Sequence, residues 1–179
     1  MSLINFLRKI FTKKDAPVKK ASNIKKAVLT GATGAMLIAA PFVGNWEGLR
    51  LGAYLDAVSV PTICYGSTKG VAIGDKKTLE ECNTLFQTEL YSYMQDVDKL
   101  VTVPLTDSRR AALTSFAYNV GVANFKRSTL LKKLNRGDTR GACNELSKWV
   151  FAKGIKLRGL ARRREAERRL CLQGLPVGA

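Results

Sequence analysis

The chain has 179 residues, 46% of them apolar and 25% charged, which is typical of a globular protein with one core and at most a short appendage. Its 30 Lys and Arg against 14 Asp and Glu give a net charge of +16, which favours a polyanionic partner: nucleic acid, anionic lipid or an acidic cell-wall polymer. The sequence contains no His, which excludes Ser-His-Asp and Cys-His catalytic pairs and most zinc sites.

The first 26 residues are strongly basic, with eight Lys or Arg and one Asp, and residues 27–46 then form a run of twenty without a charge. A helix of that length spans roughly 30 Å, the thickness of a bilayer core. Because the cations lie on its N-terminal side only, the pattern predicts a cytoplasmic N-terminus with the remainder of the chain outside.

Small and polar residues lower the hydrophobicity of this run, so it would anchor the chain in a membrane only weakly. It can be interpreted as a cleaved signal peptide, as a buried helix of a soluble protein, or as a weak signal anchor that inserts and later leaves the bilayer. Its length and one-sided flanking charge favour the third interpretation.

The next segment predicts a short helix over residues 45–52, closed by Gly52, followed by short edge strands within residues 54–65. A turn near residues 57–60 would join these strands. Residues 78–81 (TLEE) form a capping box, which predicts a helix that runs to about Lys99.

Four further helices are predicted, over the RRAALTSFAYNVG stretch ending at Gly121 and over residues 128–135, 138–151 and 158–172. The Arg-rich part of the last helix, interrupted by Glu165 and Glu167, is interpreted as ion pairing on a helix surface. The fold class is therefore α+β and mainly α, with a small β-element near the start of the body.

Cys64, Cys82, Cys143 and Cys171 are widely spaced and form no C-x-x-C pair. An even number permits two disulfides, with three connectivities, in an oxidising compartment. Buried free thiols are the alternative in a reducing one.

Two acids, Glu47 and Asp56, lie nine positions apart in an apolar stretch. A desolvated carboxyl keeps its proton, whereas a hydrogen-bonded and partly wet one stays ionised, and glycosidic bond hydrolysis needs one of each. Thr62 lies an even number of residues beyond Asp56 across the predicted turn, so its hydroxyl could hold a water beside that carboxylate. Spacing alone is weak evidence, because two acids nine apart occur in almost any protein.

The pattern Glu47-x8-Asp56-x5-Thr62 resembles that of phage-type lysozymes, glycoside hydrolase family 24, the endolysins of bacteriophages. The resemblance continues through WEGLRLGAYLD, TICYGST, RRAALTSFAYNVG, NFKRSTLLKKLNRGD and GLARRREAERRL, in the family's order. It implies hydrolysis of the β-1,4 bond between N-acetylmuramic acid and N-acetylglucosamine of peptidoglycan. It also implies a two-lobed lysozyme fold with a small β-sheet in the N-terminal lobe and a helical C-terminal lobe.

By this resemblance Glu47 is the general acid, and Asp56 with Thr62 activates the water, with inversion at the anomeric carbon. Tyr118 and Ser128 are candidates for substrate binding, and each could equally be structural. The chain departs from the family at Ser67, where members commonly have His. The resemblance implies no cofactor and no metal, peptidoglycan glycan strands as partner, no nucleic acid, and a monomer.

The uncharged run resembles the leader of signal-anchor-release endolysins, which predicts a basic segment 1–26, an anchor 27–46 and a catalytic domain 47–179. The protein would wait in the host inner membrane and become soluble in the periplasm after release. Because the anchor contains no Cys, activation by refolding is expected, and the four cysteines would form static bridges. A cationic membrane-active or nucleic-acid-binding protein without catalysis is the alternative function.

Overall fold

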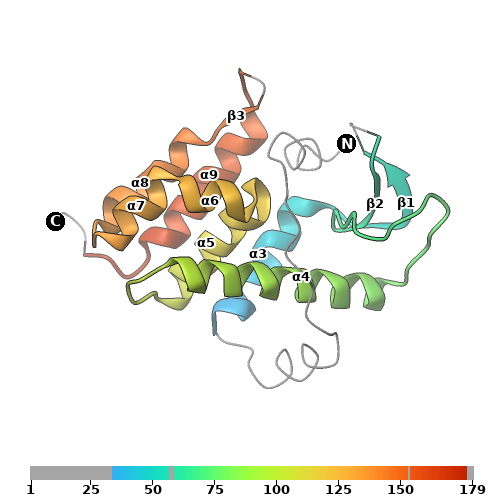
Figure 1. Ribbon diagram of the computed structural model, residues 1–179, viewed down its shortest axis with the longest axis horizontal. Helices are drawn as coiled ribbons and strands as arrows, with labels where there is room; N and C mark the ends of the chain where they lie inside the picture. The colour runs from blue at the N-terminus through green and yellow to red at the C-terminus, as the bar shows by residue number, and fades with distance from the viewer. Residues whose placement is uncertain (1–33, 57–58, 153, 177–179) are drawn as a thin grey trace.

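The computed structural model describes residues 34–56, 59–152 and 154–176. It has two lobes connected by a long helix, as the sequence predicted (Figure 1). The elements, in chain order, are α3 (Gly34–Glu47), β1 (Arg50–Leu55), β2 (Pro61–Cys64), α4 (Leu79–Leu100), α5 (Asp107–Val120), α6 (Val122–Arg127), α7 (Thr129–Asn135), α8 (Thr139–Glu145), η1 (Leu146–Lys148), β3 (Phe151–Ala152), β4 (Ile155–Lys156) and α9 (Arg158–Leu172). None of the helices in these ranges is both long and apolar enough to cross a bilayer.

Helix α3 covers the second half of the uncharged run and packs mainly against α5. Its small and apolar side chains Ala35, Ala39 and Val43 are fully buried there. Residues 27–33 of the predicted anchor lie outside the described ranges, as does the basic segment 1–26. The part of the run that is described is therefore a component of the folded core.

The predicted helix over residues 45–52 is wrong beyond Glu47. The helix ends because Gly48 adopts a left-handed backbone conformation, with φ of +61°, which glycine accepts without steric cost. The chain then enters β1 at Arg50, so Leu51 belongs to a strand and Leu49 to the connection before it.

The N-terminal lobe is built on the antiparallel pair of β1 and β2, as predicted for residues 54–65, although β1 begins earlier. Tyr54 pairs with Thr62 and Leu55 with Pro61, and a bulge interrupts the register on the Arg50 side. A disulfide between Cys64 and Cys82 fixes β2 to the first turn of α4.

Helix α4 runs from the N-terminal lobe into the helical lobe (Figure 1). The predicted capping box is confirmed: the Glu81 amide donates to the Thr78 hydroxyl at 3.2 Å, and the Thr78 amide donates to the Glu81 carboxylate at 2.7 Å. The bonds from Thr78 lower the pKa of Glu81. The helix continues to Leu100, one residue beyond the predicted end.

Helix α5 is the centre of the C-terminal lobe, and every residue from 111 to 120 is buried. The sequence predicted burial of one face, but α3, α4, α6 and α9 all pack around this helix. Trp149 packs edge-on against Phe116 with ring centroids 5.1 Å apart, so it adds to this core.

Three parts of the C-terminal lobe differ from expectation. Helix α6 was not predicted, and the helix expected over residues 138–151 ends at Glu145 with a 3-10 turn to Lys148. The chain then forms the β3–β4 hairpin, in which Gly154 has a φ of +76°. Helix α9 has the predicted bounds.

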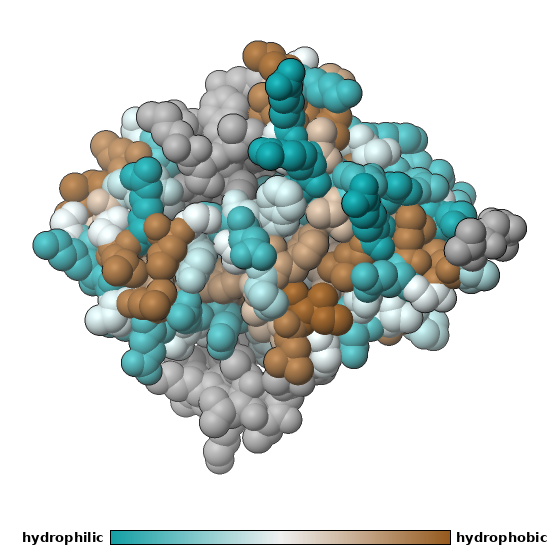
Figure 2. All heavy atoms as spheres, turned by 180° about the vertical axis from the view of Figure 1, so that it is seen from behind, coloured by the Kyte–Doolittle hydropathy of each residue, from teal (hydrophilic) through white to brown (hydrophobic). Residues whose placement is uncertain are grey.

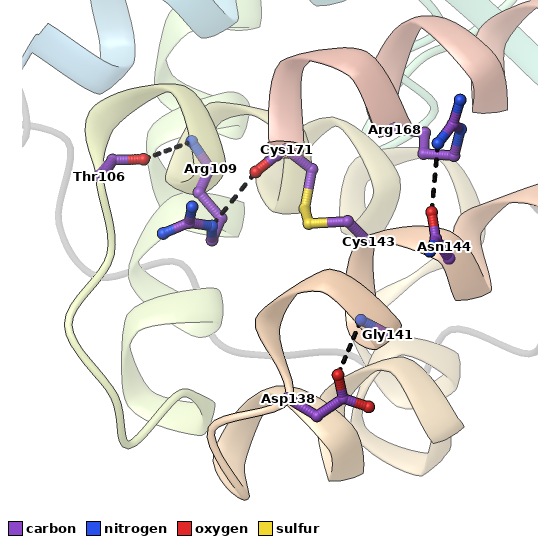
Figure 3. Close-up of a disulfide and its surroundings, with 8 residues drawn as sticks. All are labelled: Thr106, Arg109, Asp138, Gly141, Cys143, Asn144, Arg168 and Cys171. Atoms are coloured by element: carbon purple, nitrogen blue, oxygen red, sulfur yellow. Dashed lines mark hydrogen bonds between the residues drawn. A yellow bond between two sulfur atoms is a disulfide. The ribbon is translucent and has the colours of Figure 1, made fainter. Parts of the chain in front are cut away.

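All four cysteines are paired, as expected for an oxidising compartment. Cys143 of α8 is bonded to Cys171 near the end of α9, and the buried Arg109 donates from Nε to the Cys171 carbonyl at 3.2 Å (Figure 3). Burial lowers the pKa of Arg109. The bridge therefore holds α9 against α8, and the Arg109 hydrogen bond holds the same end of α9 against the start of α5.

Replacement of both Cys143 and Cys171 by Ala should lower the free energy of unfolding. The bridge closes a loop of 28 residues, and loss of that constraint on the unfolded chain costs about 3 to 4 kcal/mol. Guanidinium denaturation of the oxidised protein measures the change. An unchanged midpoint would show that the bridge adds nothing to stability.

Candidate active site

Glu47 is the last residue of α3 and is only 2% exposed. Its Oε1 accepts a hydrogen bond of 3.1 Å from Nη1 of Arg163 on α9, which is itself 1% exposed. A buried carboxylate is costly unless it is paired and hydrogen-bonded, so this contact explains how the acid is accommodated. The sequence predicted the apolar surroundings of Glu47 but not its cationic partner.

Arg163 also connects Glu47 to a second buried acid, Glu167. The Oε1 atom of Glu167 accepts from Arg163 Nε at 3.1 Å and from the Ser115 hydroxyl at 2.7 Å. Arg164 donates to the other carboxylate oxygen of Glu167 and to the side-chain oxygen of Asn119. The cluster thus contains two acids and two arginines, and their charges balance.

Burial lowers the pKa of Arg164 to about 10, while Glu167 opposes that shift. Arg164 therefore still carries its charge at neutral pH. The guanidinium also lies over the Phe116 ring, 4.9 Å from its centroid, so the cluster is packed directly against the core.

The interpretation of this region as helix-surface ion pairing is wrong for Arg163, Arg164 and Glu167, all of which are buried. It is confirmed for Glu165, which pairs with Arg168 and Arg169; these bonds lower the pKa of Glu165 to about 2. A signal for the buried group was present in the sequence. The cluster shares helical spacing with apolar residues that face the core: Leu160, Arg163, Arg164, Glu167, Leu170 and Cys171 recur at intervals of one, three or four.

Asp56 follows the end of β1 and closes the turn toward β2. Its backbone amide donates to the Val60 carbonyl at 3.0 Å, and its Oδ1 accepts from the Val60 amide at 2.9 Å. Thr62, fully buried in β2, donates its hydroxyl to the same Val60 carbonyl at 3.0 Å. The structure therefore brings Asp56 and Thr62 together around one residue of the turn.

Tyr118 and Ser128 have contacts that explain them structurally. The Tyr118 ring is fully buried between Phe86 and Tyr93, and its hydroxyl donates to Glu89 at 3.3 Å. The Ser128 hydroxyl caps α7 by accepting the Leu131 amide at 3.1 Å. Each residue was a candidate for either substrate binding or a structural role, and a structural role accounts for these contacts.

Ser67 is 2% exposed, and its backbone exchanges two hydrogen bonds of 2.9 Å with Ile63. The loop after β2 is thus ordered by main-chain bonds at the position where the family commonly has His. Across the described ranges, no group of three or more His, Cys, Asp or Glu side chains is placed to hold a metal ion.

The family model of phage lysozyme matches residues 44–167. The chain belongs to the phage lysozyme family. It is 41% identical over 159 residues to the SAR-endolysin of Bacteriophage PS119, a match that covers 85% of this chain and 94% of the relative. It is 39% identical over 160 residues to the SAR-endolysin of Enterobacteria phage P21, covering 85% and 97%.

Solved structures agree with this assignment. The active form of the P1 phage endolysin Lyz matches with a TM-score of 0.72 at 26% identity, covering 92% of this chain and all of that one. The muramidase domain of SpmX from Asticcacaulis excentricus, spelled Asticaccaulis in its title, matches at 0.70 with 30% identity, covering 75% and 94%. The predicted fold and the assignment of this phage lysozyme as a glycoside hydrolase are thereby confirmed.

Replacement of Arg163 by Met should destabilise this phage lysozyme by roughly 3 kcal/mol or more, because removal of one partner leaves Glu47 and Glu167 buried with too little positive charge. Thermal and denaturant unfolding measure the loss. Arg169 is the matched control, since its side chain is 77% exposed and its pair with Glu165 lies at the surface. Equal effects of Arg163→Met and Arg169→Met would contradict the importance of the buried cluster.

Proposed function

We propose that this endolysin cleaves the β-1,4 bond between N-acetylmuramic acid and N-acetylglucosamine with Glu47 as general acid and Asp56 and Thr62 as the water-holding pair. Membership of the phage lysozyme family supports lysis of the host cell by peptidoglycan hydrolysis, and it does not support the non-catalytic alternatives. The observation that carries the assignment of residues is the burial of Glu47 against Arg163.

In the proposed reaction, Glu47 leaves its ion-paired state by taking up a proton, and it then gives that proton to the glycosidic oxygen as the bond to the anomeric carbon breaks. The carboxylate that results lies at hydrogen-bond distance from Arg163, which compensates the new charge without rearrangement. Asp56 takes a proton from the attacking water, and the Thr62 hydroxyl orients that water. Attack from the face opposite the leaving group inverts the anomeric configuration.

Glu47→Gln should lower the rate of hydrolysis of purified, chloroform-treated cell walls by about 10²-fold or more, because general acid catalysis contributes that much and an amide has no proton to give. Glu165→Gln, at an acid with a 38% exposed side chain on α9, should remain active. Hydrolysis by Glu47→Gln at the normal rate would refute the assignment. NMR assignment of the product anomer tests inversion.

The proposal includes a membrane-held precursor in which residues 27–46 occupy the inner membrane and the catalytic domain lies in the periplasm. The relatives named SAR-endolysin and the similarity to the active form of the P1 endolysin support it. In the docked α3, Ala35, Ala39 and Val43 are buried against the protein, so they cannot lie in lipid at the same time. Glu47 reaches Arg163 only when α3 is docked, and release would therefore complete the site in a monomeric enzyme.

Leu37 allows a test of release, because its side chain is 69% exposed on the docked helix but would be within lipid in the precursor. Leu37→Gln weakens the anchor at little cost to the docked state, so it should move the protein into the soluble periplasmic fraction and cause earlier lysis. Cell fractionation and lysis timing measure both effects.

The opposite change, Gly31→Leu with Gly34→Leu, strengthens the anchor. It should keep the protein in the membrane fraction after the inner membrane is depolarised, the condition expected to cause release. When α3 is docked, a Cβ on Gly34 would also meet the Asp107 carboxylate of α5, at 2.1 Å from Oδ2. Gly44→Ala is the control, since its Cβ meets only Phe86, at 3.8 Å. If neither the Leu37 change nor the double leucine change alters the distribution of the protein between the membrane and soluble fractions, residues 27–46 do not act as a releasable anchor.

A further inference from the structure

The β3–β4 hairpin projects from the C-terminal lobe, on the side opposite the middle of α4 (Figure 1). Its base is fixed by a small cluster of its own, in which Ala152 and Leu160 are buried and Leu157 packs beside them. Its large apolar side chains are not used in that packing: Phe151 is 56% exposed and Ile155 is 65% exposed. Isolated exposed apolar residues are common, so only the surroundings of Phe151 and Ile155 can indicate whether they form a binding surface.

Those surroundings are strongly cationic. Between Glu145 and Glu165 the sequence carries seven Lys or Arg and no acid. Arg163 and Arg164 are buried, but Lys156 and Arg158 are exposed. Neither forms an ion pair with any acid of the described ranges.

The two acids that bound this stretch are already engaged elsewhere. Glu145 binds Lys133 at 2.7 Å and Lys148 at 2.9 Å, and Glu165 binds two arginines of its own helix. The hairpin therefore presents positive charge that the neighbouring acids do not neutralise. Figure 2 shows apolar atoms beside long hydrophilic side chains at the top of the molecule, where the hairpin projects.

The hairpin leads directly into α9, the helix whose Arg163 binds the candidate acid Glu47. Arg158 is the first residue of α9, and Arg163, which binds Glu47, lies five residues further, or about 7.5 Å along the helix axis. A polymer that is cut beside Glu47 extends well beyond that bond in both directions. The hairpin is close enough to contact such a polymer near the point of cleavage.

The register of the strands shows which side chains share a face of the hairpin, and this indicates what kind of partner the face suits. Phe151 pairs with Lys156 and Ala152 pairs with Ile155, so the aromatic ring and a cation share one face while Ile155 points to the other. Insertion into a bilayer would favour both apolar side chains at one tip. An aromatic ring beside a cation instead suits a sugar ring that carries a carboxylate close by.

We propose that this hairpin is a second peptidoglycan-binding site, in which Phe151 packs against a sugar ring and Lys156 and Arg158 bind carboxylates of the stem peptides. The inference rests on the proposed function, since it assigns the same polymer to both sites. Arg158 can bind a carboxylate through two parallel hydrogen bonds, whereas Lys156 acts as a point charge. The hairpin thus adds affinity for peptide-bearing glycan without a role in bond cleavage.

The test compares intact walls with glycan strands from which an amidase has removed the stem peptides. Lys156→Gln with Arg158→Gln should raise KM on intact walls about 5- to 10-fold, leave kcat within about twofold, and change nothing on peptide-free strands; the effect should shrink in high salt. Phe151→Ala should raise KM on both substrates. Ile155→Ala is the matched control on the other hairpin face and should leave both values unchanged.

Wall pelleting by full-length protein carrying Glu47→Gln separates this inference from the proposed function, because it measures binding without hydrolysis. Weaker pelleting after the hairpin changes supports the hairpin site even if the wild-type protein were to cleave nothing, an outcome that would refute only the proposed function. Unchanged pelleting and unchanged KM would overturn the inference. Loss of binding to phosphatidylglycerol vesicles with normal binding to walls would also overturn it, in favour of a membrane surface.

Discussion

The buried ion pair between Glu47 and Arg163 is the contact on which the arrangement of this protein depends. It joins the end of α3 to α9 across 116 positions of sequence, and through Glu167 and Ser115 it joins both helices to α5. Charges of this kind are tolerated in a core only when their partners are complete. Removal of α3 would leave Arg163 and Arg164 with Glu167 as their one acid in the cluster, so the charge balance itself favours the docked helix.

Under the proposed release mechanism, this constraint would explain how a weakly apolar helix could serve two environments. In that mechanism the segment would need enough apolar character to enter lipid, and its Ala35, Ala39 and Val43 are small enough to pack closely against α5 in the folded protein. A strongly apolar span would gain more from lipid than from the protein. The dilution with Ala and Gly, which makes the sequence a poor anchor, is what allows the carboxylate at its end to reach its arginine.

Much of the fold follows from local sequence signals. The capping box at Thr78, the bounds of α9 and the strands around the turn at Asp56 were all predictable, because hydrogen bonds between near neighbours define them. The β3–β4 hairpin was not, since its strands have only two residues each, too few for an alternating pattern to be recognised. Burial of Arg163 also escaped prediction, because charge is expected at a surface, and its partner lies on a helix far away in the chain.

The candidate site was predictable to a similar degree. Resemblance to phage lysozymes identified Glu47, Asp56 and Thr62, and the structure adds what sequence spacing cannot supply: the Val60 contacts that connect the last two and the cluster that surrounds the first. For Tyr118 and Ser128 the sequence left a binding role and a structural role open, and the structure adds the ring contacts of the first and the helix cap of the second.

The two disulfides have a consequence for how the enzyme can be stored. Cys64–Cys82 lies at the N-terminal lobe and Cys143–Cys171 lies within the helical lobe, and neither involves α3. Oxidation can therefore be complete before the helix docks. The proposed membrane-held precursor would therefore accumulate in its mature covalent form, with nothing left for a periplasmic oxidoreductase to do when α3 is released.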